Sequence, residues 1–131
     1  MRQRVLYRFR IRRNQLTRSL QKYCDPVRSI WVECEFDNVD HIPPVGARVG
    51  GCGFELRVFD VQFYLYKVEG SFGHRHSVLV ECLMTGEYDY KKWENGEAEI
   101  IPRKRPVTKR ELEFAKTFGW KIDGLAEEVI S

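Results

Sequence analysis

Apolar and basic side chains alternate over residues 5–12, near the start of the chain. A period of two is typical of a β-strand with one buried face, because successive side chains of a strand point to opposite sides. The odd positions would then face the core, and the arginines would face away from it. The predicted core-facing residues of this strand are Val5, Tyr7, Phe9 and Ile11.

Residues 29–36 form a second predicted strand, which carries acids where the first strand carries arginines. Glu33 and Glu35 lie on the face opposite to its apolar residues. If the two strands are neighbours, Arg8 and Arg10 lie opposite these carboxylates, and each such pair contributes a few tenths of a kcal/mol. We therefore expect the arginines to be neutralised within the protein.

The charge distribution keeps a second interpretation open. Residues 1–28 carry a net charge of +8, whereas residues 29–131 carry a net charge of −5. A basic segment of this kind is also an electrostatic footprint for phosphate groups or for an acidic partner. In the first interpretation, neighbouring acids pair with the arginines. In the second, the arginines are unpaired and converge on a concave groove.

Two stretches carry helix signals. Residues 15–23 are expected to form a short helix after the first strand, with an apolar stripe of Leu16, Leu20 and Tyr23. Thr108 and Glu111 have the spacing of a capping box, so a second helix is expected to run from residue 109 to about residue 118. Its apolar arc, which is typical of a helix packed on a sheet, consists of Leu112, Phe114, Ala115 and Phe118.

Three further stretches are predicted to be strands. They cover residues 54–68, 77–84 and 88–93, and Thr85 and Gly86 form a turn between the last two. Within the first stretch the apolar residues switch from even to odd positions near Phe59. This switch predicts a β-bulge, the device by which curled sheets and small barrels turn a corner.

These elements predict a single α+β domain over residues 1–131. The length is enough to bury one core, and 43% of the residues are hydrophobic. We expect a curled, mainly antiparallel sheet of about five strands, with a small, partly open β-barrel as a variant. A short helix follows the first strand, and the C-terminal helix packs on the sheet.

The cysteines and the hydropathy pattern bear on the cellular compartment. The four cysteines have no C-x2-C spacing and mostly lie in apolar runs, so we expect reduced, buried thiols. No apolar run approaches the roughly 20 residues that cross a bilayer, and the first residues do not resemble a signal peptide. We expect a cytoplasmic protein of a bacterium or a phage, without a membrane partner. The cysteines are Cys24, Cys34, Cys52 and Cys82.

His74 and His76 are the candidate metal ligands. Their imidazoles project to the same side if the backbone is extended, an arrangement that suits a small metal-dependent phosphoesterase or nuclease. Cys52 and Cys82 are the distant residues that would complete a Cys/His site. A hairpin tip with solvated histidines is the alternative. The chain has no G-x-S-x-G motif and no P-loop motif, and no cofactor is predicted.

Two segments are candidates for binding nucleic acid. One is a basic cluster at the start of the C-terminal helix, and the other interleaves cations with a stacking face, as single-strand binders do. The first segment contains Arg103, Lys104, Arg105, Lys109 and Arg110. The second contains Lys91, Lys92 and Trp93.

No sequence signature assigns a function, so three hypotheses remain. The first is a non-catalytic binding or structural module with a protein partner. The second is a nucleic-acid-binding protein that uses the basic and aromatic residues, and the third is the metal-dependent enzyme around the histidines. A homodimer through an exposed strand edge is a further alternative. The salt dependence of binding distinguishes the protein-binding hypothesis from the nucleic-acid hypothesis, because a phosphate binder loses affinity steeply as the salt concentration rises.

Overall fold

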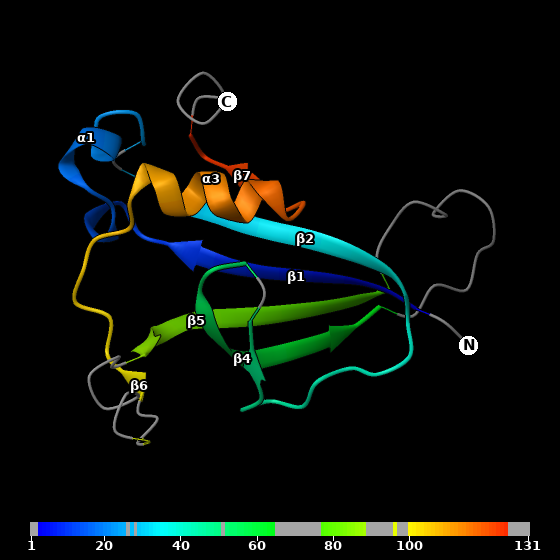
Figure 1. The fold of residues 1–131 in the computed structure, drawn as a ribbon. Helices are drawn as coiled ribbons and strands as arrows, with labels where there is room; N and C mark the ends of the chain where they lie inside the picture. Colours follow the sequence, from blue (N-terminus) through cyan, green and yellow to red (C-terminus); the bar gives the residue numbers. More distant parts are fainter. Residues whose placement is uncertain are drawn as a thin grey trace.

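The computed structural model describes residues 3–25, 27, 29–50, 52–64, 77–88, 96 and 100–125 of the chain. Within these residues it has a mixed α+β fold in which the strands form one mostly antiparallel sheet (Figure 1). The elements, in chain order, are β1 (Gln3–Ile11), the 3-10 turn η1 (Arg13–Gln15), α1 (Arg18–Gln21), β2 (Ile30–Val39), β3 (Arg48–Val49), β4 (Glu55–Phe63), β5 (Val78–Tyr88), β6 (Ile100–Ile101), α3 (Lys109–Thr117) and β7 (Lys121–Asp123).

Strand β1 lies in the interior of the sheet. Six strands follow the order β3-β4-β5-β1-β2-β7, and β6 pairs with β5 outside this path. β1 is antiparallel to β2, with Phe9 opposite Val32, and parallel to β5, with Tyr7 opposite Val80. The predicted contact between the first two strands is therefore confirmed.

The core lies between one face of the sheet and α3, which lies in front of β2 (Figure 1). Phe9 is fully buried in it, with ring centroids 5.2 Å from Phe54 and 6.1 Å from Trp120. Leu112 and Ala115 of α3 are also fully buried. Burying a large apolar side chain contributes roughly 1.5–3 kcal/mol, so this layer supplies much of the folding free energy. The predicted packing of the C-terminal helix on the sheet is confirmed.

The predicted β-bulge is confirmed in β4. Val58 lies opposite Cys82 and Asp60 lies opposite Glu81, so Phe59 is an extra residue on its strand. A bulge bends the strand that contains it, and here it lets Val58 before the bend and Val61 after it both pack on the core.

The extent of the sheet differs from the prediction. The described residues form seven strands instead of about five, and the sheet is open, with β3 and β7 at its two edges. The turn predicted at Thr85 and Gly86 is wrong, because β5 continues through both residues to Tyr88. Gly86 lies opposite Glu55 and stays in the ladder with β4, which explains why a glycine does not end the strand here.

The helix predicted over residues 15–23 is also shorter than expected. Residues 13–15 form the 3-10 turn η1, and α1 begins only after Thr17. Val107 breaks the helix, because its N–H donates to Gln15 O at 2.7 Å and its carbonyl accepts from the Thr17 N–H at 3.0 Å. Leu16 and Leu20 are buried as predicted, whereas Tyr23 is 49% exposed.

None of the helices in the described segments has the length and apolar character that crossing a membrane requires. All four cysteines are free thiols, and Cys24, Cys52 and Cys82 are buried. Burial raises the pKa of the Cys82 thiol to about 11. These thiols therefore behave as small apolar core residues, as the sequence predicts.

Candidate binding surface

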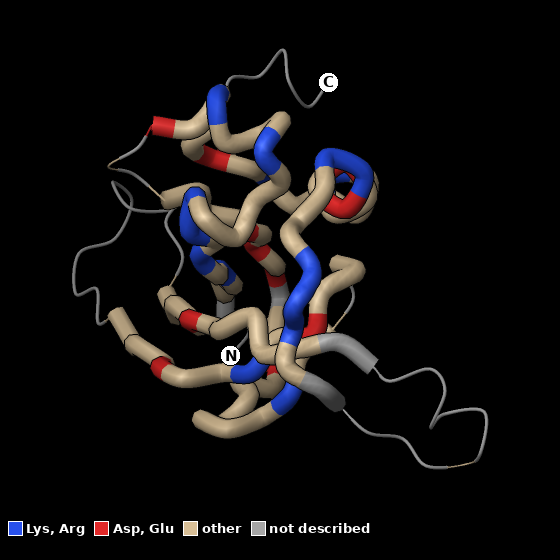
Figure 2. The backbone as a smooth tube through the Cα atoms, turned by 90° about the vertical axis from the view of Figure 1, so that its left-hand side faces the viewer, with Lys and Arg blue, Asp and Glu red and all other residues tan. Residues whose placement is uncertain are grey.

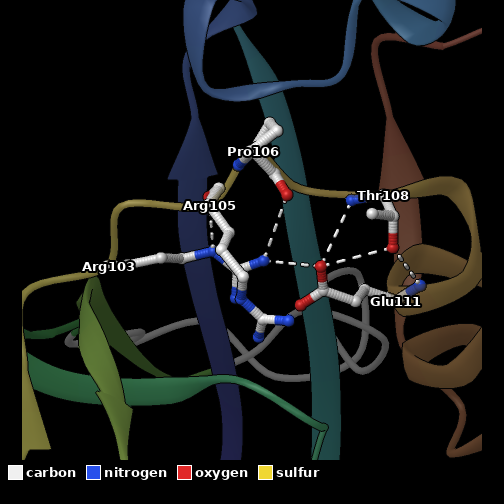
Figure 3. Close-up of polar contacts among 5 residues, drawn as sticks. All are labelled: Arg103, Arg105, Pro106, Thr108 and Glu111. Atoms are coloured by element: carbon white, nitrogen blue, oxygen red, sulfur yellow. Dashed lines mark hydrogen bonds and ion pairs between the residues drawn. The ribbon is translucent and has the colours of Figure 1, made fainter.

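Arg103 fixes the linker that joins β6 to α3. Its Nε donates to Arg105 O at 3.1 Å (Figure 3). Its Nη2 donates to Glu111 Oε1 at 2.5 Å and to Pro106 O at 3.4 Å. The side chain is only 7% exposed, and its guanidinium lies 5.7 Å from the ring centroid of Phe54. Arg103 is therefore a structural residue that holds the shape of the linker.

The same carboxylate completes the capping box of α3. Thr108 Oγ1 accepts from the Glu111 N–H at 3.3 Å, and Glu111 Oε1 accepts from the Thr108 N–H at 3.2 Å (Figure 3). The first N–H groups of a helix have no partner within the helix, and a carboxylate there also complements the helix dipole. The capping box predicted from the sequence is confirmed. Because Glu111 also binds Arg103, the linker and the helix start are joined as one unit.

The other four basic residues of the predicted cluster are exposed. They lie on the linker and the first turn of α3, at the end of the sheet that faces the viewer in Figure 2. Lys109 Nζ forms an ion pair with Glu113 Oε1, one helical turn further on, at 3.8 Å. The structure therefore brings the cluster together as a surface but removes Arg103 from it. The exposed cations are Lys104, Arg105, Lys109 and Arg110.

Helix α3 also exposes two phenylalanines. Phe114 is 50% exposed and Phe118 is 55% exposed, and their ring centroids lie 4.9 Å apart with the planes inclined at 63°. The sequence places both in the same apolar arc as Leu112 and Ala115. Only the latter two reach the core, because the arc is wider than the part of the helix that contacts the sheet. An aromatic pair at the solvent edge of such an arc is the signal that the sequence interpretation missed.

Gly53 holds Phe114 in place. The glycine has φ +86°, and a Cβ atom at this position would lie 2.8 Å from Phe114 Cδ1. The ring therefore packs directly on bare backbone. A hollow of about 380 Å³ adjoins it, lined by Gly53, Arg105, Thr108, Arg110, Glu111 and Phe114. We call Phe114, Phe118, Gly53, Lys109 and Arg110 the α3 surface.

The remaining candidate residues lie outside the described part of the chain. These are the possible metal ligands His74 and His76 and the possible stacking segment Lys91, Lys92 and Trp93, so their roles stay predictions. Among the residues that the structure does describe, no group of three or more His, Cys, Asp or Glu side chains could hold a metal ion.

Comparisons of the chain with protein-family models, with curated proteins and with solved structures find no match. The function is therefore inferred from the residues and the geometry of this chain alone.

Proposed function

We propose that the protein is a non-catalytic binding module and that its α3 surface binds a protein partner. The exposed, mutually packed rings of Phe114 and Phe118 support this proposal most strongly. Binding energy at protein interfaces is concentrated in a few residues, and aromatic and arginine side chains are enriched there. Here Arg110 lines the same hollow as Phe114, so an apolar centre lies beside a basic rim.

The α3 surface is also held in shape before any partner arrives. Phe114 packs on Gly53, and the start of the helix is joined to the linker through Arg103 and Glu111. A side chain that is already ordered loses little conformational entropy on binding, so more of the contact energy is kept as affinity. This ordering distinguishes the two rings from apolar side chains that are merely exposed.

Selection from a displayed library of random peptides tests the proposal and does not require that the partner be identified first. We expect the selected peptides to carry an apolar side chain, and Phe118→Ala to weaken their binding by about tenfold or more. Phe63→Ala is the matched control, because Phe63 is an exposed phenylalanine of β4 outside the α3 surface. If both variants bind the selected peptides like the wild type, the α3 surface is not the binding site.

Nucleic acid is the second candidate ligand. Arg105 and Arg110 line the same hollow as the exposed ring of Phe114, and single-strand binders combine cations with such stacking faces. A gel shift with single-stranded DNA and RNA would then show binding that weakens steeply with salt, and Lys109→Ala would reduce the salt dependence. The absence of a shift at low salt would remove this candidate.

A further inference from the structure

A second hollow, of about 450 Å³, adjoins the linker and differs in character from the one beside Phe114. Three basic residues line it, together with two amide side chains and one hydroxyl group, and none of the described lining residues carries a carboxylate. Met84 and two prolines supply its apolar walls. The polar residues are Arg103, Lys104, Arg105, Asn14, Gln15 and Thr85.

Three of these polar side chains have N–H groups that are not used in hydrogen bonds with the described part of the chain. Lys104 makes no ion pair or hydrogen bond with the described part of the chain. Arg103 uses Nε and Nη2 for its contacts with the linker and Glu111, which leaves Nη1. Gln15 Oε1 accepts from the Arg12 N–H at 2.7 Å, so the amide Nε2 of Gln15 stays available to donate.

The chain builds this hollow from three separate segments. The bonds between Val107 and the backbone of Gln15 and Thr17 hold η1 beside the linker. Strand β5 reaches the hollow because it runs on through Thr85, whose Oγ1 donates to Glu55 O at 3.5 Å and can therefore only accept from the hollow side. The available donors therefore approach the hollow from η1 and from the linker, β5 supplies part of its wall, and backbone contacts fix each segment.

We propose that this hollow binds a phosphate monoester. A phosphoryl group carries a charge of about −1.5 to −2 near neutral pH and three strong acceptor oxygens, which suits cations and neutral donors from several directions. A carboxylate offers only two coplanar oxygens. The volume lies within the range of small-molecule sites, so the organic part of the ligand has room against Met84 and the prolines. This site is separate from the α3 surface and does not depend on it.

Titration of the 15N-labelled full chain by NMR, at constant ionic strength, tests the proposal. Glycerol phosphate is the probe and acetate is the control anion. We expect saturable shifts of the Lys104, Gln15 and Thr85 amides, with a dissociation constant on the order of 1 mM. Affinity is expected to rise between pH 5 and pH 7, because the second ionisation of the phosphate has a pKa of about 6.

Two variants separate a specific site from general attraction to positive charge. Lys104→Ala is expected to weaken glycerol phosphate binding by about tenfold, the effect of one lost charge-assisted contact. Arg57→Ala removes the same charge from an exposed position of β4 outside the hollow, and we expect an affinity within about twofold of the wild type. Phe118→Ala should also leave this affinity unchanged, so failure of the α3 proposal and failure of this one are distinguishable.

Three results would overturn the proposal. One is the lack of saturable shifts at about ten times the expected dissociation constant. Another is equal binding of acetate. The third is an oligonucleotide without terminal phosphates that binds through Lys104 while glycerol phosphate does not, which would assign the hollow to a nucleic-acid backbone.

Discussion

Arg8 Nη2 lies 2.6 Å from Glu81 Oε1, across the parallel pair of strands β1 and β5. The guanidinium carbon also lies 4.6 Å from the ring centroid of Trp31. In the antiparallel register with β2, Arg8 is opposite Glu33, the carboxylate that the sequence predicts as its partner. Within the described residues no ion pair joins these two. The arginine is neutralised by the neighbouring strand on its other side.

This pairing predicts that Glu81→Gln destabilises the protein more than Glu33→Gln does. Arg8 and Glu81 are both partly buried, and removal of the Glu81 charge leaves the guanidinium without its anion in a place where water reaches it poorly. We expect the free energy of unfolding to fall by about 1–2 kcal/mol for Glu81→Gln. For Glu33→Gln we expect a change within about 0.5 kcal/mol. Urea denaturation measures both, and equal effects would contradict the assignment.

The arginine pairing shows what the alternating pattern can and cannot predict. The period of two correctly separates core positions from outward positions, because it depends only on strand geometry. It contains no information on sheet order, so the parallel neighbour β5 and its Glu81 could not be foreseen. The register sets Arg10 opposite Trp31 instead of Glu35. The predicted pairing of Arg10 with Glu35 is therefore wrong, and Arg4 contacts Glu35 and Asp37 instead, at 3.8 and 2.7 Å.

Gly53→Ala is expected to cost more stability than Gly46→Ala. Both glycines have a positive φ, +86° and +94°, so an alanine strains the backbone at either position. Only at Gly53 does the new Cβ also meet a neighbour, at 2.8 Å from Phe114 Cδ1, whereas nothing lies within 4 Å of it at Gly46. We expect a loss of about 1 kcal/mol for Gly46→Ala and about 1–2 kcal/mol more for Gly53→Ala.

A double-mutant cycle with Phe114→Ala isolates the contact with the ring. Removal of the ring relieves the clash, so Gly53→Ala in the Phe114→Ala background should cost only the backbone strain seen for Gly46→Ala. Thermal or urea unfolding of the four proteins gives the coupling free energy. A coupling close to zero would show that Phe114 does not rest on Gly53 in solution.

Glu111→Ala is expected to destabilise α3 and the linker together. The carboxylate accepts from Arg103 Nη2 and from the Thr108 N–H, so its loss leaves an almost fully buried guanidinium and a helix start without partners. We expect a loss of about 2–3 kcal/mol, against less than about 0.5 kcal/mol for Glu113→Ala. Glu113 is the matched control because its pair with Lys109 is exposed and 3.8 Å long. Hydrogen exchange of the amides of residues 103–112 should increase for Glu111→Ala only.

The candidate surface could be predicted from the sequence in part. The capping box of Thr108 and Glu111 is a local signal that depends on helix geometry, and it is confirmed. The burial of Arg103 has no local signal in the sequence, because it depends on where Phe54 and Glu111 lie in the fold. A helical wheel of α3 likewise gives the direction in which each side chain points, but it does not show how much of the apolar arc contacts the sheet. The exposure of Phe118 therefore needed the structure.

The thiol of Cys82 predicts a loss of stability in alkaline solution. Its pKa is raised to about 11, first by burial and then by the nearby Cys52 and Glu81, whereas an unfolded thiol has a pKa of about 8.5. The folded state therefore keeps its proton over a range in which the unfolded state loses it. This contribution to stability is complete below about pH 8.5 and is lost as the pH rises towards about 11.

Comparison with Cys82→Ala isolates this effect from the other groups that titrate in the same range. The variant lacks the thiol, so its free energy of unfolding should be lower than that of the wild type by a constant amount from pH 6 to about pH 8. Above that range the difference should shrink by up to about 1.4 kcal/mol per pH unit, because one proton separates the two states of the wild type. Urea denaturation at each pH measures the difference. Parallel curves up to about pH 11 would mean that Cys82 ionises as freely in the folded protein as in the unfolded chain.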